Sequence, residues 1–150
     1  MRLEALTDPQ LVFADLPCFD RSSLLRSFAE RIVEAGRLDD TEALYSKLWE
    51  REQLGSTAIG DGVAVPHCKV ADLSQVIVAI GLLRNGIEFG AVDHQPVRLF
   101  FVVVSPEDQP AAHLQCLAAI SKWIKAERHI ERIMKLEDSA SILDLIREDS

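Results

Sequence analysis

Cysteine is scarce in this sequence, and the few cysteines show no pairing pattern. The 150 residues include Cys18, Cys68 and Cys116, an odd number without a CxxC spacing. This usage predicts neither a disulfide framework nor a zinc ribbon. We expect three reduced thiols, with Cys116 on the packed face of a helix.

Long apolar runs are also missing. The longest, residues 76–83 and 99–104, fall far short of the roughly 20 residues that a membrane helix requires. The first residues carry an acid at Glu4 and no apolar signal-peptide core. These features predict a cytoplasmic protein without membrane insertion.

Positive charge is in deficit. Sixteen Lys and Arg stand against 24 Asp and Glu, which gives a formal net charge of −8 at pH 7. A protein that binds the nucleic-acid backbone concentrates Lys and Arg on one face, so nucleic acid is not an expected partner. An acidic surface favours a basic protein partner instead.

The composition is that of an ordinary folded protein. Hydrophobic residues make up 48% and charged residues 27% of the chain, as in globular domains. A chain of 150 residues is the size of one domain, and we expect a single domain over 1–150.

The apolar pattern predicts both helices and buried strands. Strands are expected at 11–13, 74–83, 87–89 and 97–104, with a turn at Asn85-Gly86. Helices are expected over 20–35, 40–52, from 111 onward, 130–136 and 141–146. The helical periodicity of the segment from 111 comes from Leu114, Leu117, Ala118, Ser121 and Ile124. Strands that are apolar on both faces require helices on both faces, which indicates a layered α/β domain.

The most distinctive stretch is residues 55–68. Gly60 and Gly62 predict a tight turn that leads into an extended segment. Pro66 restricts its own backbone and biases Val65 toward an extended conformation, so that His67 cannot continue a helix. A histidine held in this way suits a neutral nucleophile near pH 7.

Two further residues belong to the candidate site. His113 is expected in the first turn of its helix, where the helix dipole favours an anion and opposes a charged imidazole. Arg51 is expected near the end of the helix before the glycine-rich turn. We expect His67 and His113 to meet, with the fixed, forked positive charge of Arg51 beside them.

Two motifs carry a resemblance to a known family. The first runs from Arg51-Glu52 through Gly55-Ser56-Thr57 to Pro66-His67. The second is Pro106-Glu107-Asp108-Gln109 with His113-Leu114, Leu117 and Ile120. Together they resemble enzyme IIA proteins of the fructose/mannitol class of the sugar phosphotransferase system. The chain is most similar to the nitrogen-regulatory branch of that class.

The resemblance implies a fold, a reaction and partners. The fold is α/β, a single layered domain with a mixed central sheet flanked by helices on both faces. His67 is implied to accept a phosphoryl group from the histidine phosphocarrier protein, with assistance from His113 and Arg51. No metal, nucleotide or other cofactor takes part. Regulatory targets or a IIB domain are the implied downstream partners, and a shallow site rather than a deep pocket is expected.

Two positions depart from the family pattern. Cys68 stands where glycine is common, which would narrow access beside His67 or add redox sensitivity. Asp61 stands where asparagine is frequent, and it would repel a phosphoryl group if it faced the site. Both Asp and Asn suit such a turn.

Other interpretations use the same residues. His67, Cys68 and His113 are zinc-ligand types, but neighbours on an extended segment point in opposite directions. A Cys-His nucleophile using Cys68 or Cys116 meets the same objection. A binding module that keeps the fold without being phosphorylated also stays open.

Four residues outside the motifs receive ordinary structural roles. We assign His94 and His129 to loop and surface positions. Trp49 and Trp123 lie at helical positions typical of core or interface residues rather than of a ligand cage.

Overall fold

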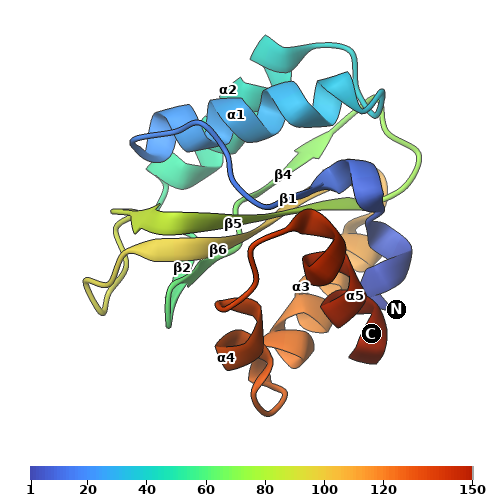
Figure 1. The fold of residues 1–150 in the computed structure, drawn as a ribbon. Helices are drawn as coiled ribbons and strands as arrows, with labels where there is room; N and C mark the ends of the chain where they lie inside the picture. The colour runs from blue at the N-terminus through green and yellow to red at the C-terminus, as the bar shows by residue number, and fades with distance from the viewer. Residues whose placement is uncertain (150) are drawn as a thin grey trace.

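A computed structural model describes residues 1–149, which form a mixed sheet between two layers of helices (Figure 1). One face is covered by α1 (Arg21–Glu34) and α2 (Thr41–Gln53). The other is covered by α3 (Pro110–Lys125), α4 (His129–Ile133) and α5 (Ser139–Asp149), together with the 3-10 turn η1 (Leu3–Leu6). The predicted α/β class with helices on both faces is confirmed.

The sheet has six strands, and β6 pairs with three of the others, β3, β4 and β5. The strands are β1 (Val12–Phe13), β2 (Ala58–Gly60), β3 (Val63–Ala64), β4 (His67–Val70), β5 (Ile77–Ile87) and β6 (Val97–Pro106). They lie in the order β1-β5-β6-β3-β2, and β4 pairs with β6 as well. The β5–β6 and β2–β3 pairs are antiparallel and the other pairs are parallel, so the sheet is mixed, as predicted.

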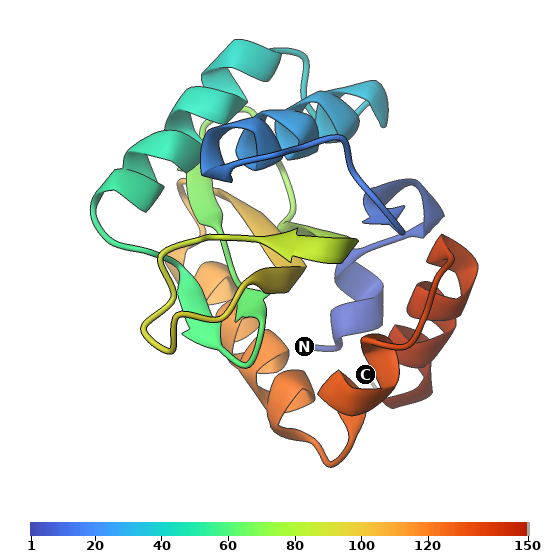
Figure 2. The same cartoon turned by 60° about the vertical axis from the view of Figure 1, so that its left-hand side comes forward.

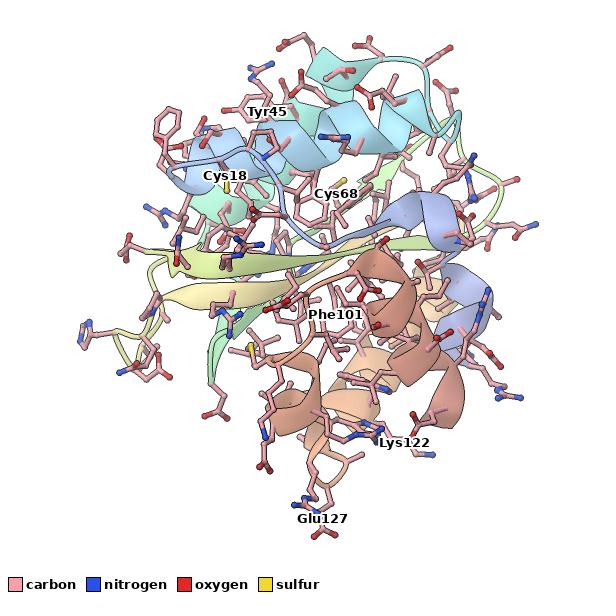
Figure 3. All side chains as sticks on the ribbon, in the orientation of Figure 1. Cys18, Tyr45, Cys68, Phe101, Lys122 and Glu127 are labelled. Atoms are coloured by element: carbon pink, nitrogen blue, oxygen red, sulfur yellow. The ribbon has the colours of Figure 1, made fainter. Side chains whose placement is uncertain are left out.

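Alternation along β6 divides the core into two layers. Phe100, Val102 and Val104 pack beneath α1 and α2, whereas Leu99, Phe101 and Val103 pack against the helices of the other face. Successive side chains of a strand point to opposite faces, so an almost continuous apolar run fills both layers. Figure 3 shows the division: Cys68 lies on the α1–α2 side of the sheet and Phe101 on the opposite side.

Local signals set the helix starts and stops. Asp20 accepts a hydrogen bond from Ser23 N, and Asp40 accepts one from Ala43 N, so both helices begin at a capping aspartate. Gly36 follows the end of α1 with a φ of 77°, a conformation that glycine adopts without steric cost. Pro110 is the first residue of α3, where a missing N–H costs nothing.

The predicted turn at Asn85-Gly86 is wrong. The strand β5 continues through these residues to Ile87, which pairs with Val97, and the register shifts between Leu82 and Ile87. Gly86 has a φ of 74°. A glycine with positive φ serves a bulge as well as a hairpin turn, and the sequence does not distinguish the two. The chain reverses within residues 88–96 instead.

The helix predicted after Pro110 is confirmed, but the residues that give its periodicity are not the ones it buries. The side chains that α3 buries are His113, Cys116, Ile120 and Trp123, whereas Leu114 is 66% exposed. Leu117 and Ile124 are half-buried beside this stripe. Two overlapping apolar stripes run along the helix, and packing against the sheet selects the one that includes His113. Cys116 is buried on the packed face, as predicted.

His129 is not a surface residue. Its ring is 3% exposed, stacks on Trp123 with centroids 4.4 Å apart, and donates from Nδ1 to the Trp123 carbonyl at 2.7 Å. The same carbonyl accepts from Ala126 N at 3.3 Å at the end of α3, so the imidazole adds a second hydrogen bond to it. His94 lies exposed in the loop before β6, as predicted.

Candidate functional site

The backbone around His67 is held on both sides. Ala64 pairs with Phe100 and His67 with Val103, so β3 and β4 follow one another along the same edge of β6. Val65 and Pro66 interrupt this line. Val65 N donates to the Thr57 carbonyl at 3.0 Å, and Val103 N donates to the Pro66 carbonyl at 2.9 Å. These two hydrogen bonds fix the backbone between β3 and β4, and His67 is the first residue of β4.

The imidazole of His67 is oriented by its own backbone. Its Nδ1 lies 2.8 Å from the carbonyl oxygen of Val65. A carbonyl oxygen can only accept, so Nδ1 carries the proton and the lone pair of the neutral ring lies on Nε2. A lone pair on a ring that cannot rotate freely is a directed nucleophile.

His113 lies beside His67, as the sequence predicted. The two ring centroids are 5.5 Å apart with planes tilted by 56°. His113 is 5% exposed in the first turn of α3, and its Nδ1 lies 2.6 Å from Ser105 Oγ at the end of β6. Residues that lie far apart in the sequence meet because β4 and the end of β6 run side by side.

Arg51 reaches the same place from the last turn of α2. Its Nη1 donates to the Gly55 carbonyl at 2.9 Å, and its side chain lines the surface next to His67. The neighbouring Glu52 is 2% exposed, and it accepts from Thr57 N and Thr57 Oγ1, both at 2.8 Å. This bidentate contact holds the chain between α2 and β2.

Two hollows meet at His67. One, of about 300 Å³, runs between the β2 segment and α3, and Figure 2 shows the β2–β3 hairpin beside this helix. Its lining is mainly apolar: Ala58, Ile59, Val65, Leu117, Ile120 and Ile124, with Arg51, Ser56, Thr57 and Ser121. The other, of about 560 Å³, is lined by Lys47, Glu50, Arg51, Leu54, Cys68, Lys69 and His113. His67 lines both.

Burial and nearby positive charge favour the neutral form of both histidines. Burial lowers the pKa of His67, and the charges of Arg51 and Lys69 lower it further against the opposing Val65 carbonyl and Glu52. Burial also lowers the pKa of His113, and electrostatic interactions with His67 and Lys69 lower it further. A neutral His67 keeps its nucleophilic lone pair near pH 7.

Sequence reasoning overlooked three residues of this arrangement. Glu52 lies in the first motif without an assigned role, Lys69 lies two residues beyond His67, and Ser105 follows the strand expected over 97–104. Their residue types could have drawn attention to them. The Glu52 carboxylate is next to Arg51, the Lys69 amine is two residues after His67, and the Ser105 hydroxyl follows the apolar run 99–104. Their partners, however, are set by the sheet.

Of the two positions that depart from the family pattern, Cys68 lines one of the hollows beside His67 and Asp61 lines neither. Cys68 is 7% exposed within the core beneath α1 and α2, and burial raises the pKa of its thiol to about 12. A thiol of that pKa is a poor nucleophile and a poor metal ligand at neutral pH. Asp61 lies exposed at the tip of the β2–β3 hairpin with a φ of 57°, and it lines neither hollow.

Comparison with known proteins decides the family. The family model "Phosphoenolpyruvate-dependent sugar phosphotransferase system, EIIA 2" matches residues 5–149. The chain belongs to this family. The resemblance predicted from the two motifs is confirmed. Within residues 1–149, no helix of this enzyme IIA protein is long and apolar enough to cross a membrane.

Relatives of this enzyme IIA protein carry two kinds of name. A fructose-specific EIIA component of Haloferax volcanii is 30% identical over 97% of this chain and 95% of its own length. A nitrogen regulatory protein of Bradyrhizobium diazoefficiens is 29% identical, with the same two coverages.

Solved structures show the same fold. The nitrogen regulatory protein IIA-Ntr of Neisseria meningitidis superposes with a TM-score of 0.87 at 24% identity, covering 95% of this chain and 97% of that one. The mannitol enzyme IIA of Escherichia coli, solved in a complex with phosphorylated enzyme IIB, gives 0.78 at 19% identity, covering 95% and 99%.

Proposed function

We propose that this enzyme IIA protein carries a phosphoryl group on Nε2 of His67. The donor is the histidine phosphocarrier protein of the phosphotransferase system. The observation that carries the proposal is the 2.8 Å contact between His67 Nδ1 and the Val65 carbonyl, which leaves the lone pair on Nε2 of a ring that lies 5.5 Å, between centroids, from the ring of His113. Family membership supports the same chemistry.

The transfer is a displacement between two nitrogen atoms. The lone pair of His67 Nε2 forms the new N–P bond while the bond from phosphorus to the donor nitrogen breaks, and the donor nitrogen keeps that electron pair. Positive charge then develops on the His67 ring, and the Val65 carbonyl stabilises it through the Nδ1 proton. Positioning and charge compensation are the main requirements of such a step.

His113 and Arg51 act on the phosphoryl group. His113 donates a hydrogen bond to a phosphoryl oxygen, and the Arg51 guanidinium compensates negative charge at the transition state. The hollow lined by Ile59, Leu117 and Ile124 offers an apolar contact for the donor protein next to the nucleophile. No metal or nucleotide is needed.

The role after phosphorylation is regulatory in our proposal. The protein would bind partner proteins according to the phosphorylation state of His67, as a nitrogen-regulatory enzyme IIA; the relatives named nitrogen regulatory protein support this role. The alternative is a sugar-specific enzyme IIA that passes the group to a IIB domain, and the fructose-specific relative favours it. Transfer to a purified IIB domain separates the two.

The test is phosphorylation in vitro. The protein is incubated with phosphoenolpyruvate, enzyme I and the phosphocarrier, and its intact mass and peptides are measured at alkaline pH, since phosphohistidine is acid-labile. We expect one added phosphate, located on His67, and none on the His67→Ala variant.

The matched control is His94→Asn. His94 is exposed with a φ of 58°, a conformation that asparagine tolerates, so this variant should be labelled like the wild type. Equal labelling of His67→Ala would refute the assignment. Absence of label on folded wild-type protein with active donors would favour a binding module that is not phosphorylated.

A further inference from the structure

Ser105 is a buried hydroxyl at the end of an apolar strand. It is 0% exposed in β6, and it pairs with Lys69 in the ladder with β4. His67 and Lys69 alternate with Cys68, which faces the α1–α2 layer, so Ser105 shares the opposite face with His67. This face is the one that α3 covers, and there Ser105 contacts His113.

The direction of the Ser105–His113 hydrogen bond follows from counting donors and acceptors. Ser105 Oγ lies 2.6 Å from His113 Nδ1, and this is the only hydrogen bond of the hydroxyl within residues 1–149. If Nδ1 donated to Oγ, the hydroxyl hydrogen would be buried without an acceptor, which is costly. If Oγ donates to Nδ1, both atoms are satisfied.

We propose that Ser105 is a positioning residue that donates its hydroxyl hydrogen to His113 Nδ1 and thereby keeps the ring proton of His113 on Nε2. The proposal deepens the proposed function, because a neutral His113 can donate a hydrogen bond to the phosphoryl group from that nitrogen only in this tautomer. With the proton on Nδ1, Nε2 would present a lone pair to a negatively charged oxygen.

The two histidines thereby have opposite tautomers, because one Nδ1 faces a hydrogen-bond acceptor and the other faces a donor. The Val65 carbonyl accepts from His67 Nδ1, so the Nε2 atom of His67 holds a lone pair. The Ser105 hydroxyl donates to His113 Nδ1, so the Nε2 atom of His113 holds a proton. Before transfer both rings are neutral, one a nucleophile and the other a hydrogen-bond donor, and no proton needs to move between them.

The first measurement is the tautomer of His113 in the unphosphorylated protein. Ring nitrogen chemical shifts distinguish protonated from unprotonated nitrogens, and we expect the Nε2–H form of His113 and the Nδ1–H form of His67. This readout needs no phosphate donor. It therefore stands even if His67 proves not to be phosphorylated, and the failure of the two proposals can be told apart.

The second measurement compares variants. Ser105→Ala removes the donor, so the ring signals of His113 should lose their single-tautomer character, and phosphorylation of His67 should slow by about tenfold, less than the loss expected when a transition-state donor is removed entirely. Ser105→Thr keeps the hydroxyl and should restore both readouts. Ser27→Ala is the control, since Ser27 is also buried but donates to the Pro17 carbonyl, outside the site.

Two results would overturn the proposal. One is an Nδ1–H tautomer of His113 in the wild type. The other is a Ser105→Ala variant with an unchanged His113 spectrum and a phosphorylation rate within about twofold of the wild type, which is less than 0.5 kcal/mol. If Ser105→Thr does not fold, the wild-type tautomer and the Ser105→Ala spectrum still decide the matter.

Discussion

At the scale of single residues, the site depends on the different hydrogen-bond partners of two imidazole rings, those of His67 and His113. His67 follows Pro66, and its Nδ1 donates to a backbone carbonyl, whereas His113 lies in the first turn of α3 and contacts a buried hydroxyl. Sequence reasoning predicted that His67, His113 and Arg51 share a site, because motif and residue type are local properties. It could not assign ring atoms, since these depend on contacts with Val65 and Ser105.

His67 should titrate below the usual range of a histidine. Burial and the charges of Arg51 and Lys69 lower its pKa, so its apparent value by NMR titration should lie under the ordinary value of about 6.5. The neutral, nucleophilic form then persists to a lower pH. Arg51→Ala should move the titration upward, and a titration at or above the ordinary value in the wild type would contradict the prediction.

Arg51→Ala should slow phosphorylation of His67 by roughly 100- to 1000-fold, the order of loss seen when one donor that stabilises transition-state charge is removed. Arg51→Lys should recover only part of the rate, because lysine keeps the charge but not the planar fork. Single-turnover phosphorylation by a saturating phosphocarrier measures the effect. Arg84→Ala is the control, since Arg84 is exposed and lines neither hollow beside His67; a similar loss there would indicate a general charge effect.

At the scale of elements, the connection from α2 to β2 positions the site. Glu52, in the last turn of α2, accepts hydrogen bonds from Thr57 N and Thr57 Oγ1. The Thr57 carbonyl in turn accepts a hydrogen bond from Val65 N. The loop from α2 to β2 therefore fixes the positions of Arg51 and of Val65, whose carbonyl accepts from His67. It also forms part of the apolar hollow. Gly55 and the first motif identified this loop in the sequence, but only the structure shows that the Glu52 carboxylate is buried beside it.

Glu52→Ala should destabilise the protein and slow phosphorylation together. The substitution leaves Thr57 N–H and Oγ1 buried without their acceptor, a loss of roughly 1–3 kcal/mol in the free energy of unfolding. Urea denaturation and the phosphorylation rate measure the two effects. Glu30→Ala, an exposed glutamate on α1, should change neither. If Glu52→Ala were as stable and as fast as the wild type, the loop would not depend on this clamp.

At the scale of the whole molecule, two neutral histidines at the edge of the core link stability to pH. The pKa values of His67 and His113 are lowered in the folded state, so the unfolded state binds more protons once the pH falls below about 6.5. Their contribution to stability is complete above that pH and is lost as the pH falls toward the folded pKa values.

The free energy of unfolding should therefore decrease between about pH 7.5 and pH 5, before most carboxylates titrate. The double variant His67→Gln/His113→Gln should show a smaller decrease over the same interval. Urea denaturation at several pH values measures both proteins. An equal pH dependence would mean that the two histidines do not contribute.

The sequence by itself determined what depends on near neighbours. Asp20 and Asp40 cap their helices, Pro110 begins another, and Pro66 holds His67 at the start of a strand, all through contacts within a few residues. The tertiary structure alone decided which stripe of α3 faces the sheet, that β5 runs through Asn85-Gly86, and that Ser105 meets His113. These outcomes depend on how distant strands pair, because one strand's register and one helix's rotation are set by packing across the sheet and not by local preference.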